Sequence, residues 1–426
     1  MNRILVTGAS GRVGKEVVAG LSKRFENATI VAATRDPSVR FFSIRRRRFY
    51  VFFFFVLNCD IYTLSLSKSL SLSLSLSLSL SLSLYPNMSD FLPTRRNKKT
   101  NKHVSHQHTT TTTFEQSSSR YLKSIGADEI VSFDLEREET WEGAMEGVTH
   151  LFSSTQDKFI KEHMKFASFC KDKTSLEHVV RISCFGADDS MTSKYDPKVH
   201  VSKDDAEIPL MLQHYWWSER CFLEAGFDDG RFTSIRGNFY MNHLLKNEID
   251  SITESREFTS PLGSCKNSFV SCNDMGEAAV TCLVEGKERH GNKVYDITGP
   301  ESHSMSDVAS VLSAALKSPQ AKDVDAVRQR DLLNKTVTYV PQDIEAFEKD
   351  FGSVRAEFFE YLRNGFYSRC SPDFYNLTGR RPTTYYEYLT ENGAAGDNGL
   401  EELFSSQGAI FTKGEDLFKD LKEVQG

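Results

Sequence analysis

The chain has 426 residues and a formal net charge of −6, with 39% hydrophobic and 26% charged residues. This length and composition are typical of one or two globular α/β domains, and they exclude a membrane, collagen-like or wholly disordered protein. Residues 41–119 carry a net charge of +7, which leaves −13 on the remainder. Because an acidic body repels phosphate backbones, we expect no nucleic-acid partner.

The first predicted element is a strand at residues 3–7, followed by a glycine turn at 8–14 and a helix over 15–23. Glycines let the backbone approach a pyrophosphate, and the helix N-terminus that follows attracts the anion. Strand, glycine turn and helix in this order predict a dinucleotide site. We assign the following residues of this turn to cofactor binding: Thr7, Gly8, Ser10, Gly11, Arg12, Val13 and Gly14.

A second strand at 29–33 ends at Thr34-Arg35-Asp36, where residues of such folds contact the adenosine ribose. Arg35 favours the 2′-phosphate of NADP, and Arg12 can add a second positive group. Asp36 comes one position late for a contact with the ribose hydroxyls. The sequence therefore predicts NADP(H) in preference to NAD(H).

Residues 41–119 interrupt this pattern and resemble no folded domain. An arginine run precedes a nine-residue apolar run, strict Ser/Leu alternation fills 69–84, and a polar run ends in threonines at 109–113. The apolar run is about half as long as the roughly 20 residues of a membrane helix, so we expect no membrane association. Because a repeated CT dinucleotide encodes Ser-Leu in two of its registers, the block is either a disordered low-complexity insertion or a gene-model artefact.

Beyond the insertion, the pattern predicts further strands at 129–133, 149–152, 178–183 and 232–236, with helices between them. Six such strands predict an α/β fold with a Rossmann-type doubly wound parallel sheet. We place an NAD(P)-binding Rossmann domain at 1–40 plus 120–245. A smaller C-terminal α/β substrate domain, interleaved with Rossmann elements, is expected at 246–395, and an amphipathic tail at 396–426.

The eight cysteines indicate a reducing compartment. They form no Cys-x-x-Cys pair and have no histidine at a zinc-ligand spacing, so we expect free thiols and no metal. The apolar stretch of the first strand is too short for the core of a secretory leader, and it ends in a glycine turn. The expected location is the cytoplasm.

Several motifs give the chain a resemblance to the NmrA-like branch of the atypical short-chain dehydrogenase/reductase superfamily. They are the glycine turn at 7–14, Asp134-Leu135, Glu219 within 214–219, and the runs at 233–242, 274–279, 295–301 and 377–384. The resemblance implies a Rossmann domain with a smaller, partly helical substrate domain. It also implies either an NADPH-dependent reductase of quinones, imines or aromatic compounds, or a regulator that binds the dinucleotide without turning it over. Asp134 is assigned to the cofactor on this match.

A proton donor beside the nicotinamide is harder to identify. Ordinary short-chain reductases use Tyr-x-x-x-Lys on the helix after the fifth strand, and no tyrosine here has a lysine four residues later. Tyr215 is the nearest candidate, with Glu219 in the place of the lysine. His214 or Tyr215 acts as the donor if it faces the nicotinamide, and otherwise both are packed helix residues. Residues assigned to the substrate pocket, from the ends of the fifth and sixth strands, are Ser183, Asn238, Tyr240 and Asn242.

Two hypotheses follow from the sequence. The first is an NAD(P)(H)-binding, NADPH-dependent oxidoreductase that reduces a small quinone, carbonyl or imine substrate. The alternative is a catalytically silent, NADP-sensing regulatory protein that acts through protein partners. A small-molecule substrate is the partner expected under the first hypothesis, and a protein partner is expected only under the second.

Overall fold

The computed structural model describes residues 2–35, 40–43, 52–55, 119–187, 209–243, 248, 251–252, 255–317 and 336–391. Contacts divide the chain into two units, Met1–Asp36 with Ser117–Gly426, and Pro37–Gln116. Within the second unit, β3 (Arg40–Ser43) and β4 (Phe52–Phe55) form an antiparallel pair. The disorder or artefact expected for the rest of 41–119, and the tail expected at 396–426, lie outside the described residues.

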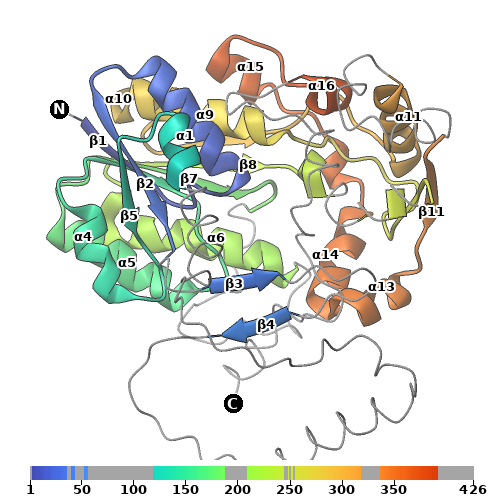
Figure 1. Cartoon of the computed structure of the whole chain (residues 1–426), viewed down its shortest axis with the longest axis horizontal. Coiled ribbons are helices and arrows are strands. Elements are labelled where there is room, and N and C mark those ends of the chain that lie inside the picture. The colour runs from blue at the N-terminus through green and yellow to red at the C-terminus, as the bar shows by residue number, and fades with distance from the viewer. Residues whose placement is uncertain are drawn as a thin grey trace, which may run out of the picture. The chain divides into compact units, whose positions relative to one another are not determined.

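A seven-stranded parallel sheet forms the centre of the first unit (Figure 1). Its order is β10-β8-β7-β6-β1-β2-β5, and every neighbouring pair is parallel. The order reverses at β1, which is the doubly wound topology and confirms the predicted fold class. The strands are β1 (Asn2–Val6), β2 (Ala28–Thr34), β5 (Glu129–Ser132), β6 (His150–Ser153), β7 (His178–Cys184), β8 (Phe232–Gly237) and β10 (Lys293–Ile297).

Six of these strands overlap the predicted ones, but the sequence pattern does not predict β10 as a strand. β10 pairs with β8 over its whole length, from Lys293 opposite Thr233 to Ile297 opposite Gly237. It is an edge strand, and Val294 in it is 47% exposed. The alternation of buried and polar residues that marks a strand is therefore weak here.

The alternation of side chains along each strand decides which helices cover which face of the sheet. Ile4 and Val6 pack in a cluster with residues of α1 (Arg12–Arg24) and α9 (Cys272–Glu285). Leu5, between them, packs with residues of α4 (Trp141–Met145), α5 (Ile160–Lys173) and α6 (Leu210–Phe222). Because successive side chains of a strand point to opposite faces, β1 contributes to both cores (Figure 1).

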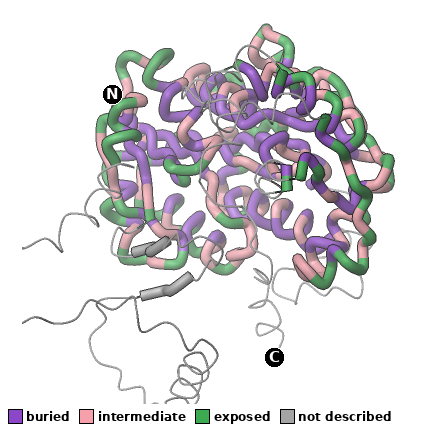
Figure 2. The backbone as a smooth tube through the Cα atoms, turned by 45° about the vertical axis from the view of Figure 1, so that its right-hand side comes forward, coloured by how far each residue is buried: buried purple, intermediate pink, exposed green. Residues whose placement is uncertain are grey.

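A third apolar cluster joins elements that follow β8. It includes residues of β9 (Glu257–Ser260), α11 (Met305–Leu316), α14 (Ser353–Leu362) and α16 (Tyr385–Thr390), and it also takes in Trp216 and Trp217 of α6. β9 pairs in parallel with β11 (Thr338–Pro341). Other elements of this half are α10 (Lys287–His290), α13 (Ile344–Phe351), a 3-10 turn at Phe366–Ser368 and α15 (Asp373–Thr378). The buried stretches, purple in Figure 2, follow the strands and the inner sides of the helices.

Two of the sequence motifs meet where the C-terminal segment docks on α9. Asp274 is fully buried, and its carboxylate accepts hydrogen bonds from Arg380 at 2.7 Å and from the amide and the hydroxyl of Thr383, both at 2.8 Å. Glu277, one turn further along α9, accepts from Nε of Arg380 at 2.7 Å. A buried carboxylate needs such donors in place of water. These bonds therefore hold the segment that leads into α16 against the Rossmann half.

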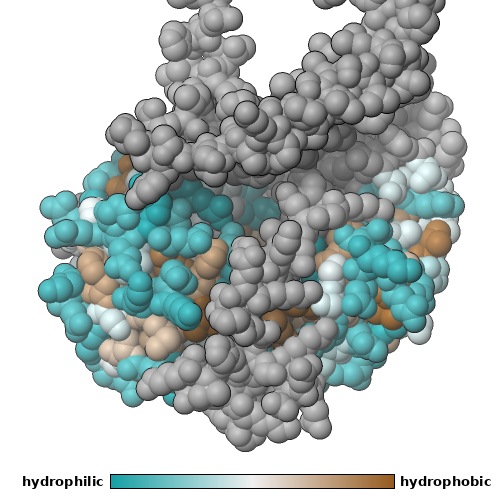
Figure 3. All heavy atoms as spheres, turned by 90° about the horizontal axis from the view of Figure 1, so that it is seen from below, coloured by the Kyte–Doolittle hydropathy of each residue, from teal (hydrophilic) through white to brown (hydrophobic). Residues whose placement is uncertain are grey.

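Over the described ranges, no helix is long and apolar enough to cross a membrane. On the face drawn in Figure 3, hydrophilic side chains predominate on the coloured surface, and hydrophobic ones are scattered among them. Scattered apolar side chains are normal on a protein surface.

Three histidines lie near the amino ends of the central strands. His150 and His178 are paired residues of β6 and β7, and their ring centroids are 6.1 Å apart. Nε2 of His178 lies 2.9 Å from the Thr233 hydroxyl, which itself donates to the His290 carbonyl at 2.7 Å. Burial lowers the pKa of His178 to about 3, and it also lowers the pKa values of His150 and His290. The fold thus accommodates the neutral form of each ring.

We expect the protein to lose stability as the pH falls from about 7 to about 5. The pKa of His178 is lower in the folded than in the unfolded state, so the unfolded chain binds the proton first as the pH falls below about 6.5. Linkage puts the loss from His178 alone at ~2 kcal/mol. Thermal unfolding at both pH values tests this, because His178→Gln, which cannot take up the proton, should flatten the pH dependence. An unchanged slope would show that His178 has no such role.

Candidate functional site

The turn between β1 and α1 packs so closely that two of its glycines cannot be replaced freely. Gly8 has a φ of +64°, and a Cβ there would lie 2.7 Å from the Ser154 carbonyl oxygen. A Cβ on Gly14 would lie 2.2 Å from the Gly8 carbonyl oxygen. The Gly11 amide donates to that same oxygen at 2.8 Å and closes the turn. Glycine at 8 and 14 thus lets the chain pass from strand to helix without a side chain in the way.

The N-terminus of α1 is suited to bind an anion. Its N-cap is Gly11, no side chain makes a capping hydrogen bond, and its first turn holds no acidic residue. The first N–H groups of a helix have no partners within the helix, and the helix dipole adds positive potential there. Ser10 and Gly11 are exposed at this point, and Arg12 and Val13 are half-buried. A helix N-terminus of this kind attracts phosphate groups, and the binding of a pyrophosphate by the residues of this turn stays a prediction.

Thr7 ties this turn to the neighbouring strand. Its side chain is fully buried, donates to the Phe152 carbonyl at 3.0 Å and accepts from the Ser154 amide at 2.9 Å. The segment that leaves β6 is therefore held directly against the glycine turn. Thr7 contributes to the site through this contact.

Arg35 and Asp134 come at the ends of two neighbouring strands, β2 and β5. The Phe133 amide donates to the Thr34 carbonyl at 2.9 Å. Arg35 and Asp134, the next residues of the two strands, therefore lie at the same place on the sheet edge. Arg35 is exposed, whereas Asp134 is half-buried and accepts from the Glu136 amide at 3.1 Å. Both lie on the β2 side of the glycine turn, where a bound dinucleotide would place its adenosine.

The two predicted proton donors, His214 and Tyr215, lie on α6. His214 is 4% exposed, and burial lowers its pKa to about 4, so the ring is neutral near pH 7. Burial raises the pKa of Tyr215 well above its usual value, and the nearby Asp157 and Cys184 raise it further. Tyr215 is therefore a neutral phenol that can donate a hydrogen bond, not a phenolate.

Glu219, which takes the place of the lysine in Tyr-x-x-x-Lys, anchors α6 to the sheet. It is 3% exposed and accepts hydrogen bonds from the Ser234 hydroxyl at 2.7 Å and from Arg236 at 2.9 and 2.8 Å. Both donors lie on β8. This carboxylate thus sets the position of the helix one turn from Tyr215, and its hydrogen-bonding capacity is used within the protein.

The residues assigned to the substrate pocket differ in their surroundings. Ser183 is 2% exposed at the end of β7, and its hydroxyl has no hydrogen-bond partner among the residues that the structure describes. The same holds within the described ranges for Oδ1 of Asn242, which is 3% exposed. The pKa of Tyr240 is raised well above its usual value by burial first and then by Cys272, Tyr215 and Cys184.

Asn238 makes its hydrogen bonds within the protein. Its side-chain amide donates to the Ser268 hydroxyl at 2.8 Å and to the Tyr367 carbonyl at 3.0 Å, and its Oδ1 accepts from the Phe239 amide at 2.6 Å. These bonds join the end of β8 to two C-terminal segments. The Ser183 hydroxyl thus lies near the end of β7 without a partner among the described residues, whereas the side chain of Asn238 connects the two halves of the unit.

A buried polar cluster around Arg181 lies beside these residues. The sequence gives one indication of it, because Arg181 interrupts the apolar strand β7. The guanidinium is fully buried, and Nη2 lies 2.5 Å from Oδ1 of Asp157. It also donates to the Ser153 hydroxyl at 2.7 Å and to the Ser218 hydroxyl at 3.2 Å. A buried charge requires partners. These could not be named from the sequence, because Asp157 is in a loop and Ser218 on α6.

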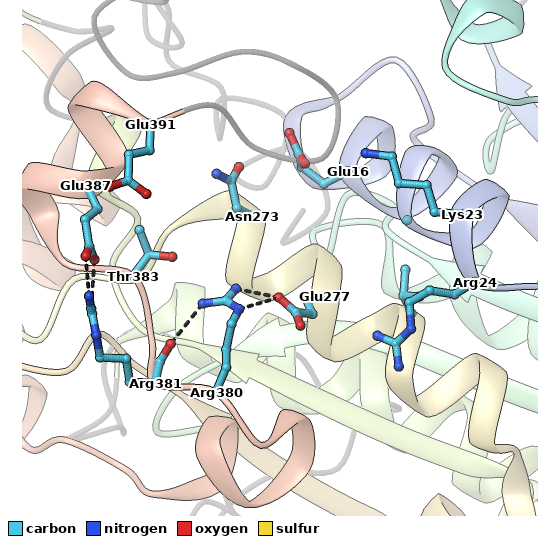
Figure 4. Close-up of a pocket in the computed structure, with 12 residues that line it drawn as sticks. Glu16, Lys23, Arg24, Asn273, Glu277, Arg380, Arg381, Thr383, Glu387 and Glu391 are labelled. Atoms are coloured by element: carbon cyan, nitrogen blue, oxygen red, sulfur yellow. Dashed lines mark hydrogen bonds and ion pairs between the residues drawn. The ribbon is translucent and has the colours of Figure 1, made fainter. Parts of the chain in front are cut away.

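A separate pocket of about 490 Å³ lies between α1, α9 and the C-terminal segment (Figure 4). Two ion pairs lie in its lining, since Arg380 contacts Glu277 and Arg381 contacts Glu387. It does not include the glycine turn. Among the described residues, no group of three or more His, Cys, Asp or Glu side chains could hold a metal.

Comparisons with known proteins agree with this fold. No protein-family model matches the chain. A curated NAD(P)H azoreductase from Xenophilus azovorans is 26% identical over 272 residues, which are 62% of this chain and 82% of that protein. The NADPH-dependent quinone oxidoreductase of Escherichia coli, complexed with NADPH, matches with a TM-score of 0.55 at 16% identity, over 90% of this chain and 97% of that chain.

The crystal structure of NmrA, a negative transcriptional regulator, matches with a TM-score of 0.50 at 13% identity, over 95% of both chains. At such identities the likeness is one of fold. It confirms the Rossmann fold, which the chain shares with NmrA and with the quinone oxidoreductase.

Replacing Gly14 by alanine should damage the turn. The new Cβ would meet the Gly8 carbonyl oxygen at 2.2 Å, and overpacking of this kind costs about 1–3 kcal/mol. We expect a lower melting temperature and weaker binding of NADPH, measured by calorimetry. Gly143→Ala is the matched control, because a Cβ there meets nothing within 4 Å. Binding that is equal in the two variants would contradict the importance of the close approach at Gly14.

Proposed function

We propose that the protein is an NAD(P)H-dependent oxidoreductase that reduces a small quinone, carbonyl or imine, with NADP(H) as the preferred cofactor. The observation that supports this most directly is the uncapped N-terminus of α1 behind a glycine turn, at the same sheet edge as Ser183 and Tyr215. The azoreductase and quinone oxidoreductase that the chain resembles carry NAD(P)H in their names. The segments within 246–395 form the substrate domain in this proposal.

The chain's own residues would bind and orient the acceptor. NADPH, when bound, supplies a hydride. The Ser183 hydroxyl has no partner among the described residues, so it is available to hydrogen-bond an acceptor oxygen or nitrogen. Tyr215 holds its phenolic proton because its pKa is raised, so it can donate a hydrogen bond to the acceptor as the acceptor gains negative charge. His214, neutral near pH 7, is the weaker candidate for this role.

A catalytically silent NADP sensor is the second candidate. It is favoured by the absence of a Tyr-x-x-x-Lys motif and by the engagement of Glu219 with β8. Both candidate functions include a cytoplasmic location. It is supported by the cysteines, because every cysteine in the described part of the chain is a free thiol.

The loss of NADPH absorbance in the presence of quinones, aldehydes and imines tests the reductase. Turnover of any of these acceptors that falls at least tenfold in Tyr215→Phe would support the proposal. Tight NADPH binding without turnover on any acceptor would favour the sensor.

The preference for NADP can be tested at Arg35. We expect Arg35→Ser to weaken NADPH binding about tenfold, because a charged hydrogen bond to the 2′-phosphate is lost. NADH, which lacks this phosphate, should bind the variant and the unaltered protein equally. An equal loss for both nucleotides would show that Arg35 does not read the phosphate.

A further inference from the structure

Asp157 lies where the far half of a bound dinucleotide would go. Arg35 and Asp134 stand on the β2 side of the glycine turn, and a dinucleotide crosses such a sheet at the point where the strand order reverses. If its adenosine lies over β2 and β5, its nicotinamide half must extend toward β6 and β7. Asp157 belongs to the segment that leaves β6.

This segment is built against the glycine turn. The Ser154 amide donates to the Thr7 hydroxyl at 2.9 Å, and the Ser154 carbonyl oxygen would meet a Cβ on Gly8 at 2.7 Å. Residues 154–157 therefore follow directly from the place where the pyrophosphate would sit. Asp157 comes three residues after Ser154 on this segment.

The Asp157 carboxylate is held by one oxygen only. Oδ1 is 2.5 Å from Nη2 of Arg181 and accepts from the Ser218 hydroxyl at 2.6 Å. Oδ2 makes no hydrogen bond to any residue in the described part of the chain. The side chain of Asp157 is 16% exposed, whereas that of Arg181 is 0% exposed. The carboxylate thus stands between a buried cation and an accessible surface.

A purely structural ion pair does not account well for this arrangement. Buried pairs contribute little net stability, because desolvation of the charges offsets their attraction. A carboxylate that served only to neutralise Arg181 would have no reason to leave Oδ2 without a partner at the sheet edge.

We propose that Asp157 binds the nicotinamide riboside half of the cofactor, with Oδ2 accepting a hydrogen bond from a ribose hydroxyl or the carboxamide N–H. Arg181 and Ser218 are positioning residues, because they orient the carboxylate through Oδ1. Carboxylates bind ribose hydroxyls at other dinucleotide sites by the same chemistry. This inference rests on the proposed NAD(P)H-dependent function.

Binding measurements with two ligands distinguish the contributions of the two halves of the cofactor. NADPH contains both halves, whereas 2′,5′-ADP contains the phosphorylated adenosine half and lacks the nicotinamide. Calorimetry with the full chain should show that Asp157→Asn weakens NADPH binding about tenfold, the size expected for a hydrogen bond to a charged group. Binding of 2′,5′-ADP should be unchanged, and this would also show that the variant is folded.

Two control variants complete the experiment. Asp172→Asn, at an exposed position of α5, should leave the affinities for both ligands unchanged. Asp134→Asn, on the adenosine side, should weaken both ligands by the same factor. NADH and ADP replace the two ligands if the protein binds NADH more tightly than NADPH.

The inference is wrong if Asp157→Asn changes neither affinity, or lowers both by the same factor, since the residue would then be neutral or structural. If that variant does not fold, Ser218→Ala, which keeps the Arg181 pair, must show a smaller loss confined to NADPH, and an equal loss for both ligands overturns the inference. Failure of the unaltered protein to bind either dinucleotide would instead overturn the proposed function.

Discussion

The close approach of Gly14 to the Gly8 carbonyl oxygen is the contact on which the site depends. It allows α1 to start immediately after β1, with its uncapped N-terminus at the sheet edge. A second close approach brings the segment after β6 against Gly8, since a side chain at Gly8 would meet Ser154. The absence of side chains at these two glycines thus places the turn and the N-terminus of α1 beside the segment that leaves β6.

Buried charge pairs hold the other parts of the site around this turn. Glu219 fastens α6 to Arg236 on β8, and Asp157 joins the segment after β6 to Arg181 on β7. Asp274 ties α9 to the C-terminal segment through Arg380. Such pairs add little net stability, but breaking one leaves an uncompensated charge, so they specify the positions of the helices and segments that they join.

Parts of the fold whose signals are local were predictable. Strand, glycine turn and helix follow one another within residues 2–24, and the structure has them there. β10 was harder, because an edge strand with an exposed Val294 lacks a clear alternation. The partners of Arg181 could not be predicted for another reason. They come from a loop and from α6, and no short-range sequence pattern relates them to Arg181.

The sequence by itself determined the unit of strand, glycine turn and helix, and the alternation of strands and helices that indicates a doubly wound sheet, because these signals lie within a few positions of one another. Only the tertiary structure decided which polar groups gather at the carboxyl ends of β6 and β7. It showed that the hydrogen bonds of Asn238 are internal, that Ser183 lacks a partner among the described residues, and that Oδ1 of Asp157 is bonded to Arg181 and Ser218. These properties arise from burial and from contacts between distant segments, which a linear pattern does not encode.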